Sequence, residues 1–463
     1  MSFDYRKGFS AYPDDSCGSD GRKAPYIDHG TDRPDVSRYY SHEEMALEWT
    51  HLWKRVWAFA GLMQDLPKVG DYFRYNLGKE SFIVVRTSMA ENGVKAFYNV
   101  CPHRGNRLIH NDFGSLRNNG FSCDFHGWQY NLDGSNRTIR DEQIFRPEVI
   151  CDRPGLTQVS CDVWNSLVFV NPNPNPETTL LEHLDVMPEH LRNYDFSKFR
   201  VLRDLEYEWE ANWKTAFEAF IEFYHADDVH PEAIPVSEML ETQYDLYGHG
   251  MSRMIIPIGY VTSRFDDRET VNDALKMFVS VYGGNPDDFA HLKGYEYKKA
   301  LIATKKQWAE KHGYAEYFAT LYDEQIADDW NYSPFPNMTI NVFVDSMLLQ
   351  IFRPHPTDPR KSIYNAITIC LPVSDDETPV LDPNAFGPET FGPKGWKGEE
   401  RPERFRPRDI SELGYLLAQD ARRVPEVQKG MESDCFTGSR LSEAEVRIRH
   451  YLAEIDRYLG RRA

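Results

Sequence analysis

The segment "CPHRGNRLIHNDFGSLRNNGFSCDFHGW" (residues 101–128) contains two short motifs, each with one cysteine and one histidine. Cys101 lies two positions before His103, and Cys123 lies three positions before His126. A glycine follows closely behind each histidine, which is typical of tight loops. Two loops that each present a thiolate and an imidazole can close on one metal centre. The four side chains are therefore candidate metal ligands.

Two kinds of metal centre accept this ligand set. Structural zinc binds two cysteines and two histidines, but zinc sites usually group Cys with Cys and His with His. A mixed pair in each loop fits a Rieske [2Fe–2S] cluster better, because there one iron is held by two thiolates and the other by two imidazoles. Zinc and a chance cluster of loop residues stay open as alternatives.

The residues around the motifs predict a small antiparallel β module over about residues 60–170. Strand-like runs at 81–87 and 94–100 flank a Glu-Asn-Gly turn, and the Asp-Gly pair at 133–134 lies between two further runs. Both are hairpin signals. Before the module, the spacing of apolar residues predicts an amphipathic helix over 41–61.

The alternating "NPNPNP" at 171–176 marks the end of the β module, because proline cannot continue a strand ladder. Beyond it the pattern is mixed. Helices are expected around 208–225 and over 297–313, a strand-like stretch covers 337–354, and a C-terminal helix begins after Ser442. With 463 residues, the chain is expected to be an α+β protein of at least two domains.

A second pair of histidines lies in "FIEFYHADDVHP" (residues 220–231). Apolar residues at three- and four-residue steps predict a helix that leads into His225. On an ideal helix, residues five apart point about 140° away from each other. His225 and His230 can therefore share a metal only if the helix unwinds after His225, and Pro231 is consistent with this. Without further context, solvated or core histidines are the alternative.

The motifs "CPHRG" and "CDFHGW" resemble the Rieske domain of the ring-hydroxylating oxygenase family. The pattern "NWK…E…YH…HP" is similar to the mononuclear-iron segment of that family, and "AQDARRVPEVQKGM" resembles its C-terminal region. The resemblance implies a β-rich Rieske domain and a helix-grip (START-like) catalytic domain with an antiparallel sheet. The domains expected from it are an N-terminal arm and helix at 1–58, the Rieske domain at 59–170 and the catalytic domain at 177–463.

The resemblance also implies the cofactors and their ligands. A [2Fe–2S] cluster would be held by Cys101, His103, Cys123 and His126. Fe(II) would be held by a facial triad of two histidines and one carboxylate, here His225, His230 and Asp420. Asp227 and Asp228 are rival carboxylates, but adjacent residues would strain a facial set already made by the two histidines.

Glu222 lies one turn before His225 and is expected to hydrogen-bond its ring. In the family that this chain resembles, a carboxylate here, most often Asp, bridges an iron histidine to a Rieske histidine of the adjacent subunit. The resemblance thus implies that Glu222 is an inter-subunit electron-transfer bridge. Some relatives that oxidise N-methylated substrates have Glu at this position, which argues against assuming ring dihydroxylation.

The implied function is that of a terminal oxygenase, or its α subunit. It would use O2 and electrons from a separate ferredoxin and/or NAD(P)H-dependent reductase to hydroxylate a small hydrophobic aromatic or alicyclic substrate, as in aromatic hydrocarbon catabolism. Because no Gly-rich dinucleotide fingerprint is present, the electrons are expected to come from that partner. The implied assembly is a homotrimer, with a β subunit as a further partner. Apolar pocket candidates are Phe217, Phe220 and Ile221.

Three alternatives accompany this interpretation. The first is a Rieske monooxygenase that performs oxidative N- or O-dealkylation. The second is an electron-carrier Rieske protein without oxygenase activity, and the third is a ligand-binding helix-grip protein with vestigial metal sites.

Composition excludes some other classes. A formal net charge of −19 argues against a nucleic-acid partner. The N-terminus lacks a signal-peptide h-region, and no apolar run approaches the roughly 18 residues needed to span a bilayer, so we expect a cytoplasmic protein that does not bind membranes. Seven scattered cysteines do not suggest a secreted disulfide framework.

Overall fold

The computed structural model describes residues 8–12, 16–116, 120–259, 261–265, 267, 270–383 and 392–461. The chain forms two compact units. The smaller unit comprises Ala46–His183 and Pro354–Asp358, and the larger unit comprises Met1–Met45, Leu184–Arg353 and Pro359–Ala463. A search of the described ranges for a helix of the length and apolarity that a bilayer crossing requires finds none.

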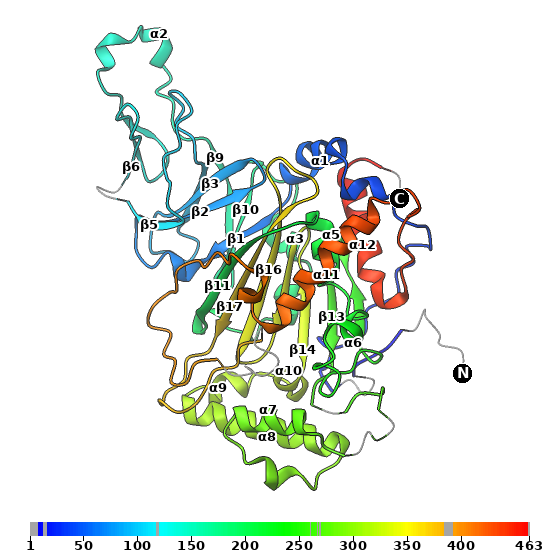
Figure 1. Ribbon diagram of the computed structural model, residues 1–463. Helices are drawn as coiled ribbons and strands as arrows, with labels where there is room; N and C mark the ends of the chain where they lie inside the picture. Colours follow the sequence, from blue (N-terminus) through cyan, green and yellow to red (C-terminus); the bar gives the residue numbers. More distant parts are fainter. Residues whose placement is uncertain are drawn as a thin grey trace. The chain divides into compact units, whose positions relative to one another are not determined.

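The smaller unit is built on two antiparallel sheets (Figure 1). A seven-stranded sheet has the order β1-β10-β9-β4-β3-β2-β5, and a three-stranded sheet has the order β6-β7-β8. The strands are β1 (Ala58–Leu62), β2 (Asp71–Leu77), β3 (Glu80–Arg86), β4 (Val94–Tyr98), β5 (Phe113–Ser115), β6 (Gly120–Ser122), β7 (Gln129–Asn131), β8 (Asn136–Thr138), β9 (Gln158–Trp164) and β10 (Leu167–Asn171). Both hairpins predicted from the sequence are confirmed, because β3 pairs with β4 and β7 pairs with β8.

The two Cys/His loops connect strands of these sheets. Residues 99–112 follow β4, and residues 123–128 join β6 to β7. Cys101 and Cys123 are buried in one apolar cluster that also contains Phe97, Phe121 and Tyr130. The core of the smaller unit therefore holds the start of each loop.

The limits of the smaller unit differ from those suggested by the sequence. The helix expected over 41–61 stops at Trp53, after α1 (His42–Glu48) and a π-helical turn, and β1 follows. Residues 46–58 belong to the smaller unit, where the Trp57 indole N–H donates to the carbonyl of Thr178 at 2.9 Å. The same contact helps to hold residues 177–183 in this unit rather than in the next.

The larger unit contains a seven-stranded antiparallel sheet with the order β11-β17-β16-β15-β14-β13-β12. Its strands are β11 (Arg200–Trp209), β12 (Gln243–Leu246), β13 (Ser252–Ile256), β14 (Asp329–Ser333), β15 (Met338–Val342), β16 (Ser346–Pro354) and β17 (Ser362–Cys370). All nine residues of β16 are buried, as expected for a central strand covered on both faces. The strand-like stretch predicted over 337–354 is confirmed as β15 and β16.

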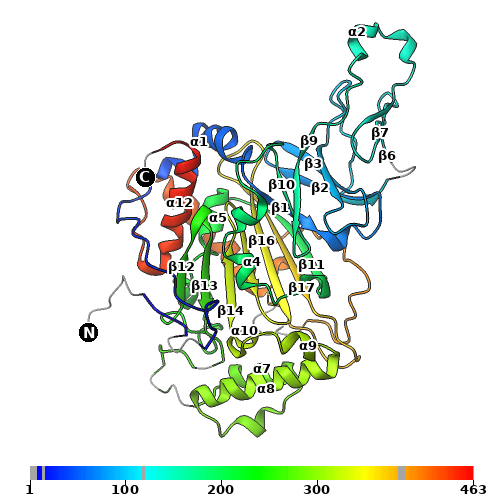
Figure 2. The same cartoon turned by 180° about the vertical axis from the view of Figure 1, so that it is seen from behind.

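Helices cover this sheet and its edge. Among the described residues, α2 (Pro147–Ile150) and most of α3 (Leu180–Leu184) belong to the smaller unit. The helices of the larger unit are α4 (Met187–His190), α5 (Trp213–Glu218), α6 (Ala226–Val229), α7 (Asp273–Val281), α8 (Gly294–His312), α9 (Ala315–Phe318), α10 (Asp323–Ala327), α11 (Tyr415–Met431) and α12 (Val446–Tyr458). Helix α11 crosses the face of the sheet that is turned to the viewer in Figure 1 and lies behind the sheet in Figure 2. Helix α8 and the capping box of Ser442 and Glu445 before α12 confirm two predicted features.

The helix expected around 208–225 is wrong in its limits. Residues up to Trp209 form β11, and α5 begins only at Trp213, after an Asn212 side chain that accepts from the backbone N–H of Lys214 at 2.9 Å. Helix α5 ends at Glu218, seven residues before His225. Apolar residues recur past this end without helical geometry, and they differ in burial: Ile221 is buried, whereas Tyr224 is exposed.

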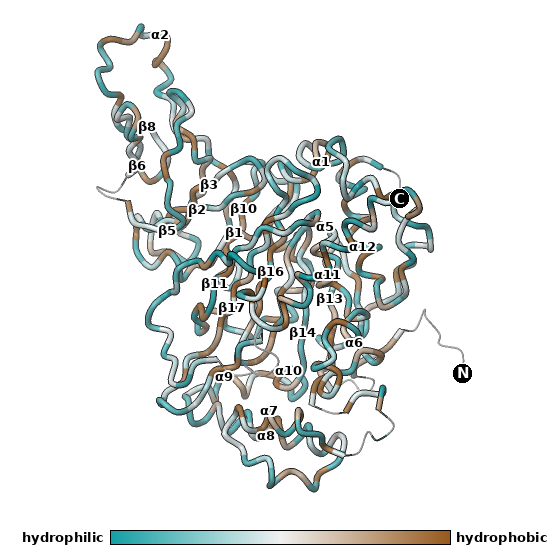
Figure 3. Tube along the Cα trace, in the orientation of Figure 1, coloured by the Kyte–Doolittle hydropathy of each residue, from teal (hydrophilic) through white to brown (hydrophobic). Residues whose placement is uncertain are grey.

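The interior of the larger unit is not purely apolar. In Figure 3 the strands of its sheet carry teal as well as brown segments. Buried polar side chains on β14, β15 and β16 include Asp329, Asn331, Thr339 and Gln350. Burying such groups without partners costs free energy, so their presence indicates a site inside the larger unit that interacts with polar groups.

Candidate functional site

The two Cys/His loops have the same backbone design. The N–H of Gly105 donates to the carbonyl of Cys101, and the N–H of Gly127 donates to the carbonyl of Cys123, each at 2.9 Å. Gly105 has a φ of 78° and Gly127 a φ of 73°. Only glycine adopts this conformation readily, so the glycine behind each histidine allows each loop to fold back on its cysteine.

The two histidines of these loops lie side by side. The ring centroids of His103 and His126 are 4.5 Å apart, and His103 stacks on Trp128 at 4.7 Å. The Nδ1 atoms of both rings are buried and have no hydrogen-bond partner among the described residues. Buried ring nitrogens normally have a partner, so these two atoms are suited to bind a metal.

The two cysteines fit the same centre. Cys101 and Cys123 are buried free thiols, and neither forms a disulfide. Burial raises the pKa of Cys101, and the nearby Cys123 thiol raises it further. The Tyr130 hydroxyl lies 3.1 Å from Cys101 Sγ, and the Asn106 amide donates to Cys123 Sγ at 3.7 Å. Two thiols and two orphaned imidazole nitrogens are the donor set of a [2Fe–2S] cluster of the Rieske type.

A second group of candidate ligands converges in the larger unit. One ligand atom each from His225, His230 and Asp420 lies within 4.8 Å of the others. Asp420 Oδ1 is 3.2 Å from His230 Nε2 and 3.6 Å from His225 Nε2. The two histidines flank the one-turn helix α6, with His225 still in helical geometry and His230 outside it (φ −122°, ψ 61°). The unwinding expected directly after His225 therefore occurs at His230.

The opposite nitrogens of the two rings are already bound. His225 Nδ1 donates to Glu222 Oε1 at 2.5 Å, and His230 Nδ1 donates to Gln419 Oε1 at 2.7 Å. A ring that donates through Nδ1 presents the lone pair of Nε2, and such outer partners fix the orientation of metal-binding histidines. The three side chains thus fit a 2-His-1-carboxylate iron site.

Glu222 is held firmly in this position. Its Oε2 accepts from the backbone N–H groups of Tyr224 and His225, and its side chain is almost fully buried. Burial lowers the pKa of His225, but Glu222 and then Asp420 outweigh this effect and raise that pKa to about 9. The site is therefore electronegative and suited to a cation.

Asp420 lies on α11 and is 3% exposed, which excludes an ordinary solvated helix carboxylate. Of the rival carboxylates, Asp227 forms an ion pair with Arg264 at 2.7 Å, and Asp228 is exposed. Neither belongs to the converging group. The helix α11 thus supplies both the third candidate ligand and, through Gln419, the partner of His230.

A cavity of about 150 Å³ adjoins the three candidate ligands. Among the expected pocket residues, Phe220 lines this cavity, whereas Phe217 and Ile221 do not. Phe217 packs in the core against Phe352 and Tyr451. Because α5 ends at Glu218, Phe217 lies in the helix, whereas Phe220 and Ile221 lie beyond it.

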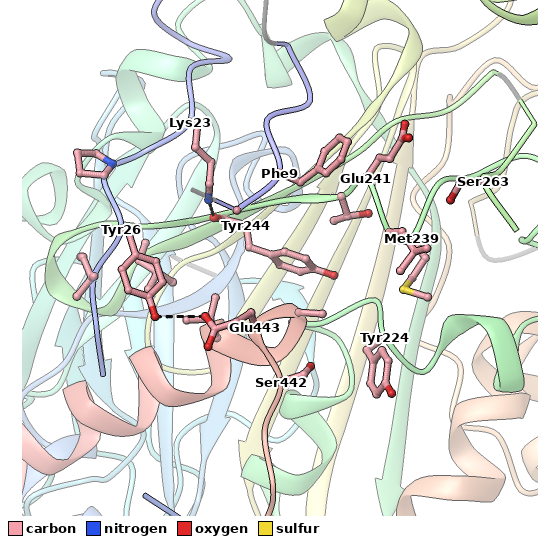
Figure 4. Close-up of a pocket in the computed structure, with 18 residues that line it drawn as sticks. Phe9, Lys23, Tyr26, Tyr224, Met239, Glu241, Tyr244, Ser263, Ser442 and Glu443 are labelled. Atoms are coloured by element: carbon pink, nitrogen blue, oxygen red, sulfur yellow. Dashed lines mark hydrogen bonds between the residues drawn. The ribbon is translucent and has the colours of Figure 1, made fainter. Parts of the chain in front are cut away.

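A larger cavity of about 670 Å³ lies between the N-terminal segment, the stretch 239–246 and the turn before α12 (Figure 4). Aromatic residues at its wall include Phe9, Tyr26, Tyr224 and Tyr244, and the Tyr26 hydroxyl donates to Glu443 at 3.3 Å. None of the seven candidate metal ligands lines this cavity.

Comparison with known protein families gives two matches. Residues 196–461, more than half of the chain, match the model of the ring hydroxylating alpha subunit (catalytic domain), and residues 56–146 match the Rieske [2Fe-2S] domain. The chain belongs to the ring-hydroxylating alpha-subunit family. Its cofactors are accordingly a [2Fe–2S] cluster and a non-haem iron, and the expected fold class is confirmed.

Curated relatives include both monooxygenases and dioxygenases. The glycine betaine monooxygenase oxygenase subunit of Chromohalobacter salexigens is 28% identical over 207 residues, which are 45% of this chain and 44% of that protein. The biphenyl 2,3-dioxygenase subunit alpha of Rhodococcus jostii is 27% identical over 212 residues, 45% of each protein. The matching regions therefore span less than half of these relatives.

Solved structures resemble the chain over nearly its full length. A quaternary ammonium Rieske monooxygenase in complex with L-carnitine has a TM-score of 0.60 at 16% identity and covers 96% of this chain and 98% of its own. A naphthalene 1,2-dioxygenase bound to phenanthrene has a TM-score of 0.62 at 15% identity, with 94% and 96% covered. These likenesses establish the shared fold.

Sequence reasoning missed Gln419 and Asn106, which contact candidate ligands through hydrogen bonds. Gln419 directly precedes Asp420, but no sequence signal distinguishes it from other polar residues of α11. Asn106 lies inside the "CPHRGN" loop, and its proximity to the motif was the only available signal.

Gln419→Leu should weaken the binding of mononuclear iron by about 10- to 100-fold, because His230 loses the acceptor that orients its ring. The measurement is a titration with Fe(II) of protein from which the mononuclear iron has been removed, and the [2Fe–2S] content is recorded in the same sample. Gln419→Glu retains an acceptor and should bind Fe(II) close to the wild-type level. Unchanged affinity in Gln419→Leu would show that this hydrogen bond does not position the ligand.

Proposed function

We propose that this chain is the terminal oxygenase, or α subunit, of a Rieske non-haem iron system. The observation that carries the proposal is the convergence of His225, His230 and Asp420 at a cavity in the larger unit. An electron carrier has no use for an iron site beside a substrate-sized cavity. The electron-carrier alternative is therefore the weaker one.

In this proposal the smaller unit receives electrons through a cluster held by Cys101, His103, Cys123 and His126. The cluster supplies one-electron transfer when bound. The four side chains hold it at the end of two stiff loops, and the tyrosine and asparagine groups near the sulfur atoms tune it by hydrogen bonding.

The larger unit would hold Fe(II) through His225, His230 and Asp420. A 2-His-1-carboxylate site leaves open positions at which Fe(II) activates dioxygen next to a substrate. The protein's part is to orient the two imidazoles through Glu222 and Gln419 and to surround the open positions with a small, mostly apolar cavity.

Glu222 is proposed to bridge His225 to a Rieske histidine of an adjacent subunit. Its contact with His225 Nδ1 supports one half of this bridge. Tyr224, whose backbone N–H donates to Glu222, is 54% exposed, and exposed apolar side chains of this size often mark a protein interface. A homotrimer, with or without a β subunit, would place a partner there, and a separate ferredoxin or reductase would supply electrons.

Two substrate classes fit the cavity. Its lining by Phe220, Phe223, Met254, Ile256 and Leu348 supports hydroxylation of a small aromatic or alicyclic compound. A volume of about 150 Å³ suits a molecule of benzene size. The second class is oxidative N-dealkylation, which is supported by relatives named as glycine betaine and carnitine monooxygenases. Cytoplasmic location is part of the proposal.

The test of the proposed function is product analysis with ¹⁸O2, a surrogate reductase and a panel of both substrate classes. We expect a product that contains ¹⁸O, or an aldehyde released from an N-alkyl group together with the dealkylated amine. Consumption of electrons with no oxidised product from any member of either class would contradict the oxygenase assignment.

Glu222→Ala should slow the re-oxidation of the reduced cluster by about 100-fold while both metal centres remain filled at saturating Fe(II). The reason is that the proposed route between the centres runs through this carboxylate. Stopped-flow absorbance of the reduced protein mixed with O2 and substrate measures the rate.

The matched control is Gln419→Leu, which also removes the Nδ1 partner of a candidate iron ligand but lies off the proposed route. At saturating Fe(II) it should lose far less of the re-oxidation rate than Glu222→Ala. Equal losses in the two variants would reduce Glu222 to a positioning residue.

A further inference from the structure

One wall of the 150 Å³ cavity is polar. Asp329, Asn331, Asn341 and Gln350 line it from three neighbouring strands. Asn331 on β14 pairs directly with Asn341 on β15, and Asp329 precedes Asn331 by two residues. Side chains two residues apart on a strand share a face, so these groups form one continuous patch.

The hydrogen bonds of this patch run in one direction. The Tyr364 hydroxyl donates to Gln350 Oε1 at 2.6 Å, and the Gln350 amide donates to Asn341 Oδ1 at 3.3 Å. The Asn341 amide then donates to Asp329 Oδ2 at 2.8 Å. Because each of these three bonds donates in the direction of the carboxylate, Asp329 is the terminal acceptor of the series.

The second oxygen of Asp329 has no partner. Asp329 is 5% exposed, and its Oδ1 is buried without a hydrogen bond among the described residues. Leaving such an acceptor unmet costs stability, and a carboxylate costs more than a neutral group. A ligand in the cavity is the natural partner, since Asp329 lines it.

The positive charge of Arg447 acts on Asp329, but Arg447 Nη1 donates to Asn331 Oδ1 and its Nε donates to Ser252 Oγ, both at 2.9 Å. Within the described ranges, no Lys, Arg or His nitrogen forms an ion pair with Asp329 at 4.0 Å or less.

Burial raises the pKa of Asp329 to about 7, although the bond from Asn341 and the charge of Arg447 oppose the shift. Near neutral pH both the neutral and the ionised form of Asp329 are therefore populated. A bound cation shifts this balance to the carboxylate, because a positive charge within a few ångströms stabilises it.

We propose that Asp329 is a specificity-determining residue that binds a positively charged nitrogen of the substrate through its unpartnered Oδ1. This inference rests on the proposed function and names a substrate class for it, a small ammonium compound. The apolar wall would contact the alkyl groups on that nitrogen. Phe220, Phe223 and Phe343 add aromatic rings near the same space, and such rings attract cations.

The test uses two pairs of probes. Each pair combines a cation with an uncharged molecule of nearly the same shape. Choline and 3,3-dimethyl-1-butanol form the quaternary pair, and protonated N,N-dimethylethanolamine and 3-methyl-1-butanol form the pair with an N–H donor. Binding to the whole purified protein, without electron donor or O2, is measured by isothermal titration calorimetry and equilibrium dialysis. The expected result is that at least one cation binds about tenfold or more tightly than its uncharged isostere.

Asp329→Asn keeps the size of the side chain and removes its charge. We expect this variant to bring the affinity ratio of the preferred pair close to one. Asp323→Asn is the matched control, because Asp323 pairs with Lys306 on the surface and lies outside the cavity, so the ratio should stay at the wild-type value. If Asp329→Asn does not fold, the ratio of the affinities of the wild-type protein for the cation and its uncharged isostere tests the inference.

Three results would overturn the inference: no measurable binding of either cation, equal binding of cation and isostere by the wild-type protein, or an unchanged ratio in folded Asp329→Asn. Because binding is measured without turnover, these results leave the oxygenase assignment intact. Conversely, a preference for the cation that is lost in Asp329→Asn would support the inference even if the experiment with labelled dioxygen yields no product.

Discussion

Two hydrogen bonds at the rear of the imidazole rings govern the larger unit's site. Glu222 and Gln419 each take the Nδ1 proton of one histidine, and both Nε2 atoms are thereby directed toward the Asp420 carboxylate. These bonds fix the orientation of the two rings and so favour the convergence of the three ligand atoms. Three features of the backbone position these side chains. Helix α5 ends before the site, the short helix α6 separates the two histidines, and α11 lies on the sheet.

The smaller unit solves the same problem in another way. There the loops are shaped by backbone bonds that need glycine at Gly105 and Gly127. His103 stacks on Trp128, and the rings of His103 and His126 meet edge to face. Among the described residues, the Nδ1 atoms of these two rings have no hydrogen-bond partner, whereas in the larger unit it is the Nε2 atoms that face Asp420. The two candidate centres thus use opposite nitrogens of the imidazole ring.

Local patterns could be predicted from the sequence, and distant contacts could not. The Cys/His tetrad, the two hairpins and the helix over 297–313 depend on residues close in sequence. The helix expected over 208–225 was wrong in its limits because residues up to Trp209 pair in β11 and the chain leaves helical geometry after Glu218, although apolar residues recur beyond it. Asp420 was reached only through the family resemblance, and Gln419 and Asp329 were missed because a single polar residue on a helix or strand carries no signal of what it faces.

The central claim is that His225, His230 and Asp420 form an iron site separate from the cluster. Electron paramagnetic resonance of Asp420→Ala, recorded once on the dithionite-reduced protein and once on its nitric oxide adduct, tests it most directly. In Asp420→Ala we expect the signal of the reduced cluster to persist at wild-type intensity. The high-spin nitric oxide signal of mononuclear iron, which the wild type shows, should be lost. A retained nitric oxide signal in Asp420→Ala, or its absence from iron-loaded wild type, would contradict the account.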